Sequence, residues 1–363
     1  MEKNALAVEI LKNYKKRLDV YLKEYFTQKN KQAQKIDPIA VQVVEVIEKF
    51  VLSGGKRIRP ALAYYSYLAA GGKDGEHIIK ASMSIELAHA FLLIHDDIID
   101  RDDIRHNTTT IHKVYRSLGE DLKLDENDAM HFGNSMAIVV GDIAYSMANE
   151  VSFNSDFDAE VILLSLKKIQ EIVYRTVPGE MLDVLMEAKG TATEEEIMRM
   201  YEGKTARYTF EGPLQLGAVL AGQSDNKELM KALTNYSLPI GRAFQIRDDI
   251  LGIFGEKKKT GKAVGADIIE GKQTLLIVKA FEKGTKEQKQ EMKKLLGKKD
   301  LSLPELEIFR KIIRETGSLE YSQKLSEELV AEALCALKKI EFKNSEAKNF
   351  LEGIAEYIIK REV

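Results

Sequence analysis

A cluster of acidic residues stands at the end of an apolar segment. Residues 96–103 read DDIIDRDD and follow the apolar run AFLLIH. Side chains four residues apart lie on one face of a helix, so Asp96 and Asp100 are expected to point to the same side. Like charges at this spacing repel each other, and either water or a bound cation must compensate them. The cluster is therefore either a solvated helix end or part of a cation site.

A second pair of aspartates favours the cation site. Residues 242–252 read RAFQIRDDILG, so Asp248 and Asp249 also follow an apolar helical run. Carboxylates suit hard cations, and Mg²⁺ takes few protein ligands and leaves its remaining positions to water and phosphate oxygens. If the two helices face each other across a cavity, their carboxylates would hold Mg²⁺ together with a diphosphate.

Such a diphosphate needs basic partners, and three short motifs supply them. Lysine binds phosphate as a point charge and arginine binds it with two parallel hydrogen bonds. The motifs are GGKRIRP (54–60) with Lys56 and Arg59, YEGKTARYTF (201–210) with Lys204 and Thr205, and TGKAVGADIIEGKQT (260–274) with Lys262, Asp267 and Lys272. Each motif alone could be surface charge, but their combination with two acidic clusters indicates a phosphate site.

Helical periodicity dominates the segments that carry these motifs. From Ile85 to Asp100 the apolar positions wrap most of a helix, which is typical of a buried one. Similar patterns occupy 4–26, 39–52, 57–70, 134–151, 158–174, 194–206, 228–251 and 319–338. No convincing set of strands accompanies them. We therefore predict an all-α helical bundle around a deep central cavity.

Length, charge and composition argue against several other classes of protein. The 363 residues carry a formal net charge of −3, which argues against a general nucleic-acid binder. A single cysteine, Cys335, suits a reducing cytoplasm. No apolar run approaches the roughly 20 residues of a membrane span, and the first residues do not resemble a signal peptide. The best linker candidate is 284–300, whose charges favour a solvated helical face over a binding patch. We expect one domain over residues 1–363.

In this order, the motifs resemble the trans-isoprenyl diphosphate synthases, or polyprenyl synthetases, and most closely the short-chain group. LIHDDIIDRDD resembles the first aspartate-rich motif of that family and FQIRDDILG resembles the second. The resemblance implies an isoprenoid-synthase-type bundle that usually forms homodimers. It also implies condensation of isopentenyl diphosphate with an allylic diphosphate, by ionisation, condensation and elimination, with three Mg²⁺ ions.

The resemblance assigns roles residue by residue. The metal ligands would be Asp96, Asp100, Asp183 and Asp248, with Asp97 as an outer partner. The allylic diphosphate would contact Arg105, Lys204, Thr205, Gln245 and Lys262, with Lys272 nearby. Isopentenyl diphosphate would contact Lys56, Arg59 and His89. The residues that carry the reaction would be Asp96, Asp97, Asp100, Lys204, Asp248 and Lys262.

Three positions depart from the family pattern. His106 and Asn107 stand where the family commonly has arginine and glycine. That arginine normally contacts isopentenyl diphosphate. We therefore expect His106 to bind isopentenyl diphosphate more weakly than the arginine would. Glu180 stands where the family has glutamine. Gly252 stands where the second motif ends in aspartate.

The product length depends on the residues just before the first motif. In the family a bulky residue five positions before the first aspartate limits the chain, and here that residue is Phe91, followed by Leu92. We predict a C20 product, geranylgeranyl diphosphate, with farnesyl diphosphate as the alternative. Phe91 could equally be an ordinary core residue.

Two other kinds of protein remain as alternatives. A terpene cyclase also ionises a diphosphate between two metal motifs, but it would not need Lys56, Arg59 and His89 for a second diphosphate. A regulatory subunit would usually lose metal aspartates, which this chain keeps.

Overall fold

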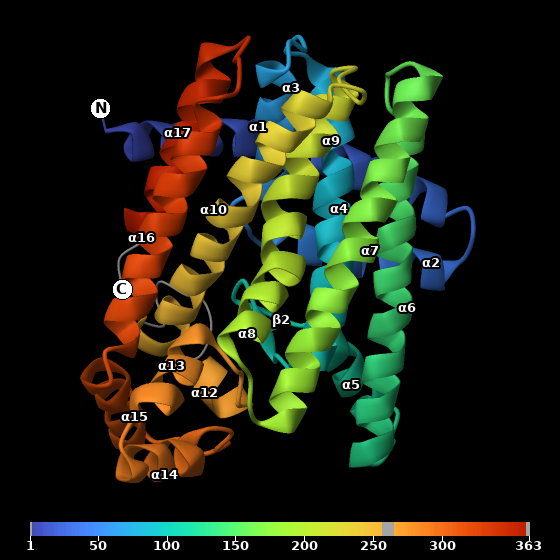
Figure 1. The fold of residues 1–363 in the computed structure, drawn as a ribbon. Coiled ribbons are helices and arrows are strands. Elements are labelled where there is room, and N and C mark those ends of the chain that lie inside the picture. The colour runs from blue at the N-terminus through green and yellow to red at the C-terminus, as the bar shows by residue number, and fades with distance from the viewer. Residues whose placement is uncertain (1, 256–264, 361–363) are drawn as a thin grey trace.

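The chain is built almost entirely of helices (Figure 1). The computed structural model describes residues 2–255 and 265–360. The first half contains α1 (Lys3–Ala33), α2 (Pro38–Leu52), α3 (Ile58–Ala69), α4 (Glu76–Ile99), β1 (Ile104–Arg105), β2 (Thr108–Thr109), α5 (Ile111–Asp121), α6 (Glu126–Phe153) and α7 (Ala159–Lys189). The second half contains α8 (Glu194–Met200), η1 (Tyr201–Glu211), α9 (Gly212–Leu220), α10 (Lys227–Phe254), α12 (Ala266–Glu270), α13 (Leu275–Lys283), α14 (Lys286–Leu295), α15 (Leu303–Glu315), α16 (Ser318–Leu337) and α17 (Ser345–Lys360). The all-α prediction is confirmed.

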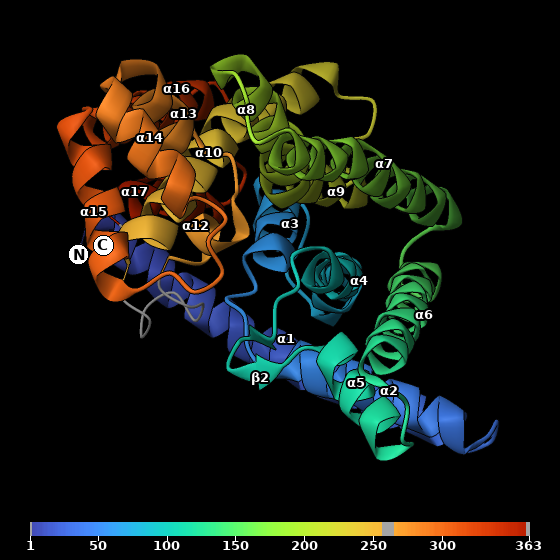
Figure 2. The ribbon, with the colours of Figure 1, turned by 90° about the horizontal axis from the view of Figure 1, so that it is seen from below.

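Helix α4 lies inside the bundle, surrounded by other helices, as the view from below shows (Figure 2). Its sequence explains this position, because apolar side chains such as Ile85, Leu87 and Ile94 point in several directions and are all buried. By length and composition alone α4 would also suffice to cross a membrane. However, 67% of its most apolar window is buried inside the protein. It is therefore a core helix, and its C-terminal end carries the first aspartate motif.

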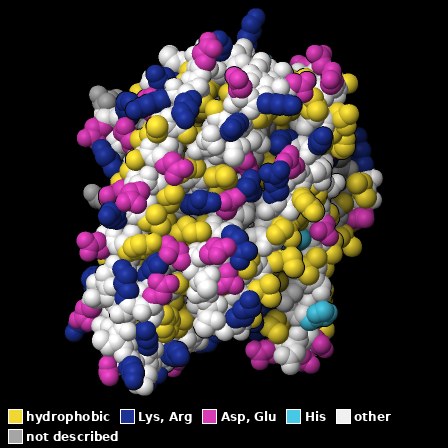
Figure 3. All heavy atoms as spheres, viewed as in Figure 1, with side chains coloured by type: hydrophobic (Ala, Val, Ile, Leu, Met, Phe, Trp, Pro, Cys, Tyr) yellow, Lys and Arg dark blue, Asp and Glu magenta, His cyan; other side chains and the backbone are white. Residues whose placement is uncertain are grey.

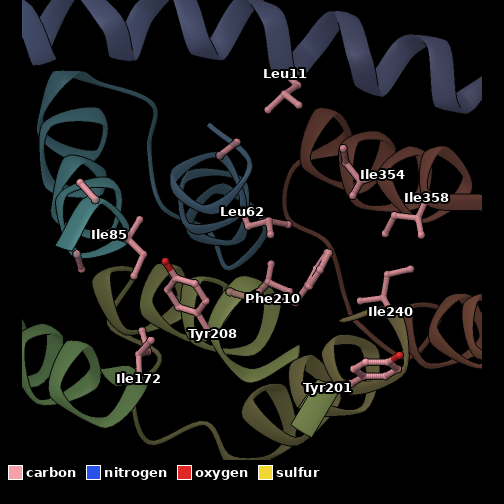
Figure 4. Close-up of a cluster of buried hydrophobic side chains, with 14 of the residues drawn as sticks. Leu11, Leu62, Ile85, Ile172, Tyr201, Tyr208, Phe210, Ile240, Ile354 and Ile358 are labelled. Carbon is pink, nitrogen blue, oxygen red and sulfur yellow. The ribbon is translucent and has the colours of Figure 1, made fainter. Parts of the chain in front are cut away.

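The buried core extends from the N-terminal to the C-terminal helices. Leu11 of α1, Leu62 of α3, Phe210 of η1, Ile240 of α10 and Ile354 of α17 belong to one cluster of buried side chains (Figure 4). Burying a side chain of this size contributes about 1.5–3 kcal/mol. This common core holds α4, η1 and α10 in fixed positions relative to one another.

Close approaches between helices depend on glycine. A Cβ on Gly179 of α7 would lie 2.3 Å from the backbone nitrogen of Lys204, and a Cβ on Gly241 of α10 would lie 2.3 Å from the Cα of Ala206. No side chain fits at such distances, so both helices can pack directly against η1. The segment η1 is a π-helix, a conformation that often occurs at functional sites.

Several predicted boundaries were wrong. The helix predicted for 158–174 continues to Lys189 and contains Pro178, whose ring removes one backbone hydrogen bond without ending the helix. The segment 284–300, by contrast, contains α14, a helix whose charged side chains are mostly exposed and which begins with a capping box between Thr285 and Gln288, in agreement with the solvated helical face expected there. A short antiparallel hairpin, β1–β2, follows the first aspartate motif and was not predicted.

Candidate active site

Carboxylates from two helices converge at the end of α4. One oxygen from each of Asp96, Asp100 and Glu180 lies within 4.8 Å of the other two. Asp96 lies in the last turn of α4, Asp100 caps the C-terminus of that helix, and Glu180 comes from α7, which packs against η1 through Gly179. The predicted pairing of Asp96 with Asp100 on one face is therefore present, and Glu180 joins them.

Lys204 of η1 lies among these carboxylates. Its Nζ is 2.7 Å from Asp183 Oδ2, 2.9 Å from Glu180 Oε2 and 3.7 Å from Asp96 Oδ1. Burial opposes the charged form of this lysine, but Asp96, Asp183 and Asp100 outweigh burial and raise its pKa. Lys204 is therefore a permanent cation in the acidic cluster.

Lys272 reaches the same cluster from the segment after α12. Its Nζ lies 2.8 Å from Asp100 Oδ2 and 3.5 Å from Glu270 Oε2. Burial again opposes the charge, and the carboxylates led by Asp100 outweigh burial, so the pKa of Lys272 is raised well above its usual value. The sequence could assign Lys272 to the site only through its motif.

Arg105 of β1 closes the acidic cluster on another side. Its guanidinium donates to Asp97, to Asp96 Oδ2 at 3.1 Å and to Asp102 Oδ2 at 3.2 Å. Burial raises the pKa of Asp97 to about 7, although Arg105 acts in the opposite direction. Asp97 is thus a buried partner of Arg105.

The second motif is tied to η1 by a chain of hydrogen bonds. Thr205 donates to Gln245 Oε1 at 2.5 Å, and Gln245 Nε2 donates to Asp249 Oδ1 at 2.8 Å. The Tyr201 hydroxyl donates to Asp249 and accepts from the Leu275 backbone N–H at 2.9 Å. Asp249 is therefore a buried structural acceptor, while its neighbour Asp248 is only half-buried.

The glycine that replaces the last aspartate of the second motif has a clear neighbour. A Cβ on Gly252 would lie 2.2 Å from Asp267 Oδ2. The Asp267 carboxylate thus occupies the volume that a side chain at position 252 would need. A larger residue at Gly252 would have to displace Asp267.

A separate basic cavity of about 150 Å³ lies between the start of α3 and the middle of α4, and Lys56, Arg59, His89 and His106 line it. Arg59 donates to Thr209 Oγ1 at 2.8 Å, and one guanidinium nitrogen lies 2.9 Å from His89 Nε2. The structure therefore brings together the residues predicted for isopentenyl diphosphate.

The protonation of His89 follows from its surroundings. Burial lowers the pKa of His89 well below its usual value, and Arg59 and Arg105 add to this effect. The neutral ring can accept from Arg59 at Nε2 and donate from Nδ1 to the Tyr208 hydroxyl. The Arg59 guanidinium also stacks 4.3 Å from the centroid of the Tyr208 ring. Tyr208 and Thr209 belong to the YEGKTARYTF motif, but no role in this cavity was predicted for them.

His106 occupies the turn of the β1–β2 hairpin. It and Asn107 have positive φ angles of 49° and 61°, as two-residue hairpin turns of type I′ require. The turn places His106 against Gly54, where a Cβ would lie 2.9 Å from the His106 Cβ. Burial lowers the pKa of His106, and Arg105 and Arg57 add to the effect. Position 106 therefore carries a neutral ring at the edge of the cavity.

Arg57 has a structural role that the sequence did not reveal. It donates to Asp19 Oδ1 at 3.0 Å, to Glu86 Oε1 at 2.5 Å and to the Val51 carbonyl at 2.7 Å. These contacts engage all three guanidinium nitrogens and orient the loop that presents Lys56 and Arg59.

Phe91 packs between α4 and α6. Its ring centroid lies 4.8 Å from that of Tyr145 and 4.9 Å from that of His95. Leu92 is partly buried against the core. Lys262, the remaining predicted site residue, lies outside the described residues.

The acidic cluster suits a divalent cation. All its donors are carboxylate oxygens, which hard cations such as Mg²⁺ prefer. In addition, Asp97 Oδ2 is buried and has no hydrogen-bond partner among the described residues. Asp96, Asp100 and Glu180 therefore fit Mg²⁺.

Known proteins resemble this chain in sequence and in fold. A model of the polyprenyl synthetase family matches residues 41–313. The chain belongs to this family. The polyprenyl synthetase is 33% identical over 318 residues to a geranylgeranyl diphosphate synthase of Saccharolobus solfataricus, covering 85% of this chain and 87% of the relative. It is 32% identical to a short chain isoprenyl diphosphate synthase of Methanothermobacter thermautotrophicus, covering 98% of both chains.

A solved structure supports the same assignment. The geranylgeranyl pyrophosphate synthase of Corynebacterium glutamicum, complexed with isoprenyl diphosphate and magnesium, superimposes on this polyprenyl synthetase with a TM-score of 0.90 at 31% identity. The match covers 97% of this chain and 99% of that one. The predicted family is confirmed.

Proposed function

We propose that this polyprenyl synthetase condenses isopentenyl diphosphate with an allylic diphosphate and that its main product is geranylgeranyl diphosphate. The observation that carries the proposal is that an acidic cluster with two lysines lies at the end of α4 while a separate basic cavity lies beside the middle of that helix. The acidic cluster with Lys204 and Lys272 suits a diphosphate bound through metal ions. The basic cavity around Arg59 and His89 suits a second diphosphate without metal. An enzyme that acts on one diphosphate needs only the first site.

The protein's own residues support each part of the reaction. Asp96, Asp100, Asp183 and Asp248 would hold Mg²⁺, three ions in this proposal, and the bound metal would supply charge neutralisation for the leaving diphosphate. Lys204, Lys272 and Arg105 would bind the diphosphate oxygens and stabilise the charge that develops as the C–O bond ionises.

The second substrate is positioned from the basic cavity. Lys56 and Arg59 would hold isopentenyl diphosphate so that its double bond attacks the allylic cation. The intermediate then loses a proton to the released diphosphate, so no side-chain nucleophile is needed. Helices packed around α4 would exclude water from the cation.

The product length is proposed from Phe91. This ring would limit the space for the growing chain, since it is wedged between α4 and α6 against Tyr145. Relatives named geranylgeranyl diphosphate synthases support a C20 product. Farnesyl diphosphate is the second candidate.

We also propose a cytoplasmic, single-domain homodimer that pairs through α6 and α7. Exposed large apolar side chains gather on these helices, on the right side of the molecule in Figure 3. They are Met130, Ile138, Val139, Phe153, Leu163, Tyr174, Val177, Met181, Val184 and Leu185. A surface of this kind usually marks an interface, and two-fold dimers are the commonest assembly. Light scattering should give a dimer mass, and Tyr174→Glu should lower it toward the monomer.

The test of the activity is a product assay. Purified protein with Mg²⁺ receives dimethylallyl, geranyl or farnesyl diphosphate, each with and without isopentenyl diphosphate. Elongated diphosphates that require isopentenyl diphosphate would support the proposal. Hydrocarbons or alcohols formed without it would instead indicate a cyclase-like enzyme.

A further inference from the structure

Glu180 differs from the family's usual glutamine and adds a negative charge at the acidic cluster. We propose that Glu180 is a third protein ligand of the cation at Asp96 and Asp100, so that this protein binds one divalent ion before the allylic diphosphate arrives. The inference deepens the proposed function, because it concerns the metal requirement of the same site.

The geometry brings the three carboxylates within reach of one ion. Their nearest oxygens lie within 4.8 Å of one another. Opposite ligands of one Mg²⁺ are about 4.2 Å apart, since each bond is about 2.1 Å long. Small side-chain rotations of Asp96, Asp100 and Glu180 would therefore bring one oxygen of each residue within bonding distance of a single Mg²⁺. A glutamine at position 180 could offer only a neutral oxygen.

The charges favour a divalent ion even without substrate. Among the described contacts of the cluster, Asp96, Asp97, Asp100, Asp102, Glu180, Asp183 and Glu270 offer seven carboxylates, against three cations, Lys204, Lys272 and Arg105. One divalent ion would offset part of this excess. With glutamine at position 180 the excess would be smaller by one charge. In a site with two aspartates, by contrast, much of the ligand charge has to come from the diphosphate itself.

Lys204 does not prevent Glu180 from binding metal. Both Glu180 oxygens contact Lys204 Nζ, at 3.1 and 2.9 Å, while Asp183 Oδ2 is closer at 2.7 Å. Lys204 can therefore stay bonded to Asp183 and to one Glu180 oxygen while the other Glu180 oxygen turns toward the ion. If Glu180 served only to position Lys204, removing its charge would change allylic diphosphate binding and leave metal binding unaltered.

The test measures metal binding without substrate. Metal-free wild type, Glu180→Gln and Glu180→Ala are titrated with Mn²⁺, and free Mn²⁺ is followed by electron paramagnetic resonance. We expect both variants to bind Mn²⁺ at least about tenfold more weakly than wild type, because ligand charge sets affinity at such sites. Glu187→Gln, an exposed glutamate two turns further along α7, is the matched control and should bind like wild type. Circular dichroism confirms that each variant is folded.

Two results would overturn the inference. One is equal Mn²⁺ affinity in wild type and Glu180→Gln, including the case in which neither binds without diphosphate. The other is an unchanged Mn²⁺ affinity with a changed KM for the allylic diphosphate, which would make Glu180 a positioning residue for Lys204. Failure of the proposed function is distinguishable, since it would appear as missing elongated products while the Mn²⁺ titration still depends on Glu180.

Discussion

Lys272 Nζ and Asp100 Oδ2 lie 2.8 Å apart although 172 positions separate the two residues. The pair joins the segment after α12 to the end of α4 and completes the cationic side of the acidic cluster. Both side chains are largely shielded from solvent, with 14% of Lys272 and 6% of Asp100 exposed. Because little water reaches either charge, each one is stabilised by the opposite charge beside it.

Replacing Lys272 should impair use of the allylic substrate. Lys272→Gln removes a buried cation from the site of the leaving diphosphate, so kcat/KM for the allylic diphosphate should fall by roughly 10²-fold or more. Steady-state kinetics with varied geranyl diphosphate measure this loss. Lys299→Gln, at an exposed position, is the control. Equal kinetics for wild type and Lys272→Gln would contradict this role.

Restoring the family's arginine at the hairpin turn should strengthen the second substrate site. His106→Arg adds a permanent charge beside Gly54, where the neutral histidine now lies. A charge-assisted hydrogen bond contributes about 1.5–3 kcal/mol, so KM for isopentenyl diphosphate should fall roughly tenfold. KM for the allylic substrate, measured in the same assay, should stay unchanged. An unaltered KM for isopentenyl diphosphate would place His106 outside that site.

Shortening Phe91 should lengthen the product. Phe91→Ala removes the ring that packs against Tyr145, and the growing chain can then extend toward α6. Liquid chromatography of the products should show diphosphates longer than those of wild type. Leu92→Ala serves as the neighbouring comparison and should have a smaller effect. An unchanged distribution for Phe91→Ala would mean that the ring is only a core residue.

The hydroxyl of Tyr201 should matter for stability. Tyr201→Phe removes the donor to the buried Asp249 Oδ2 and leaves the Leu275 N–H without its acceptor, while Asp249 Oδ1 keeps its bond from Gln245; the cost should be about 1–3 kcal/mol in the free energy of unfolding. Urea denaturation measures the loss. Tyr115→Phe is a matched control, since the buried Tyr115 hydroxyl has no hydrogen-bond partner among the described residues. Similar losses in both variants would argue against a specific role for the Tyr201 hydroxyl.

The buried His89 should make stability depend on pH. Because the folded pKa lies below the unfolded value of about 6.5, the unfolded chain binds the extra proton first. Its contribution to stability is therefore complete above pH 6.5 and is lost as pH falls, by at most about 1.4 kcal/mol per pH unit. Between pH 7.5 and 5.5 wild type should lose more stability in urea than His89→Gln. The exposed His131→Gln should keep the wild-type slope, and a wild-type slope in His89→Gln would refute the prediction.

The sequence by itself determined the helices and the faces they present. Residues four or seven positions apart share a face because of the helical repeat, so the alignment of Asp96 with Asp100, and of His89 with Asp96, was predictable from spacing alone. The all-α class followed from the same periodicity. The motifs around Lys204 and Lys272 suggested basic partners for a diphosphate, but spacing alone could not place these lysines beside Asp96 and Asp100.

Only the tertiary structure decided which faces meet. Glu180 reaches Asp96 because Gly179 lets α7 pack directly on η1, and His106 reaches Gly54 because a two-residue turn folds the hairpin back. Asp267 fills the place beside Gly252 from a separate helix. Local periodicity carries no information on such contacts, because they depend on which distant backbones can approach each other and on the core that holds them there.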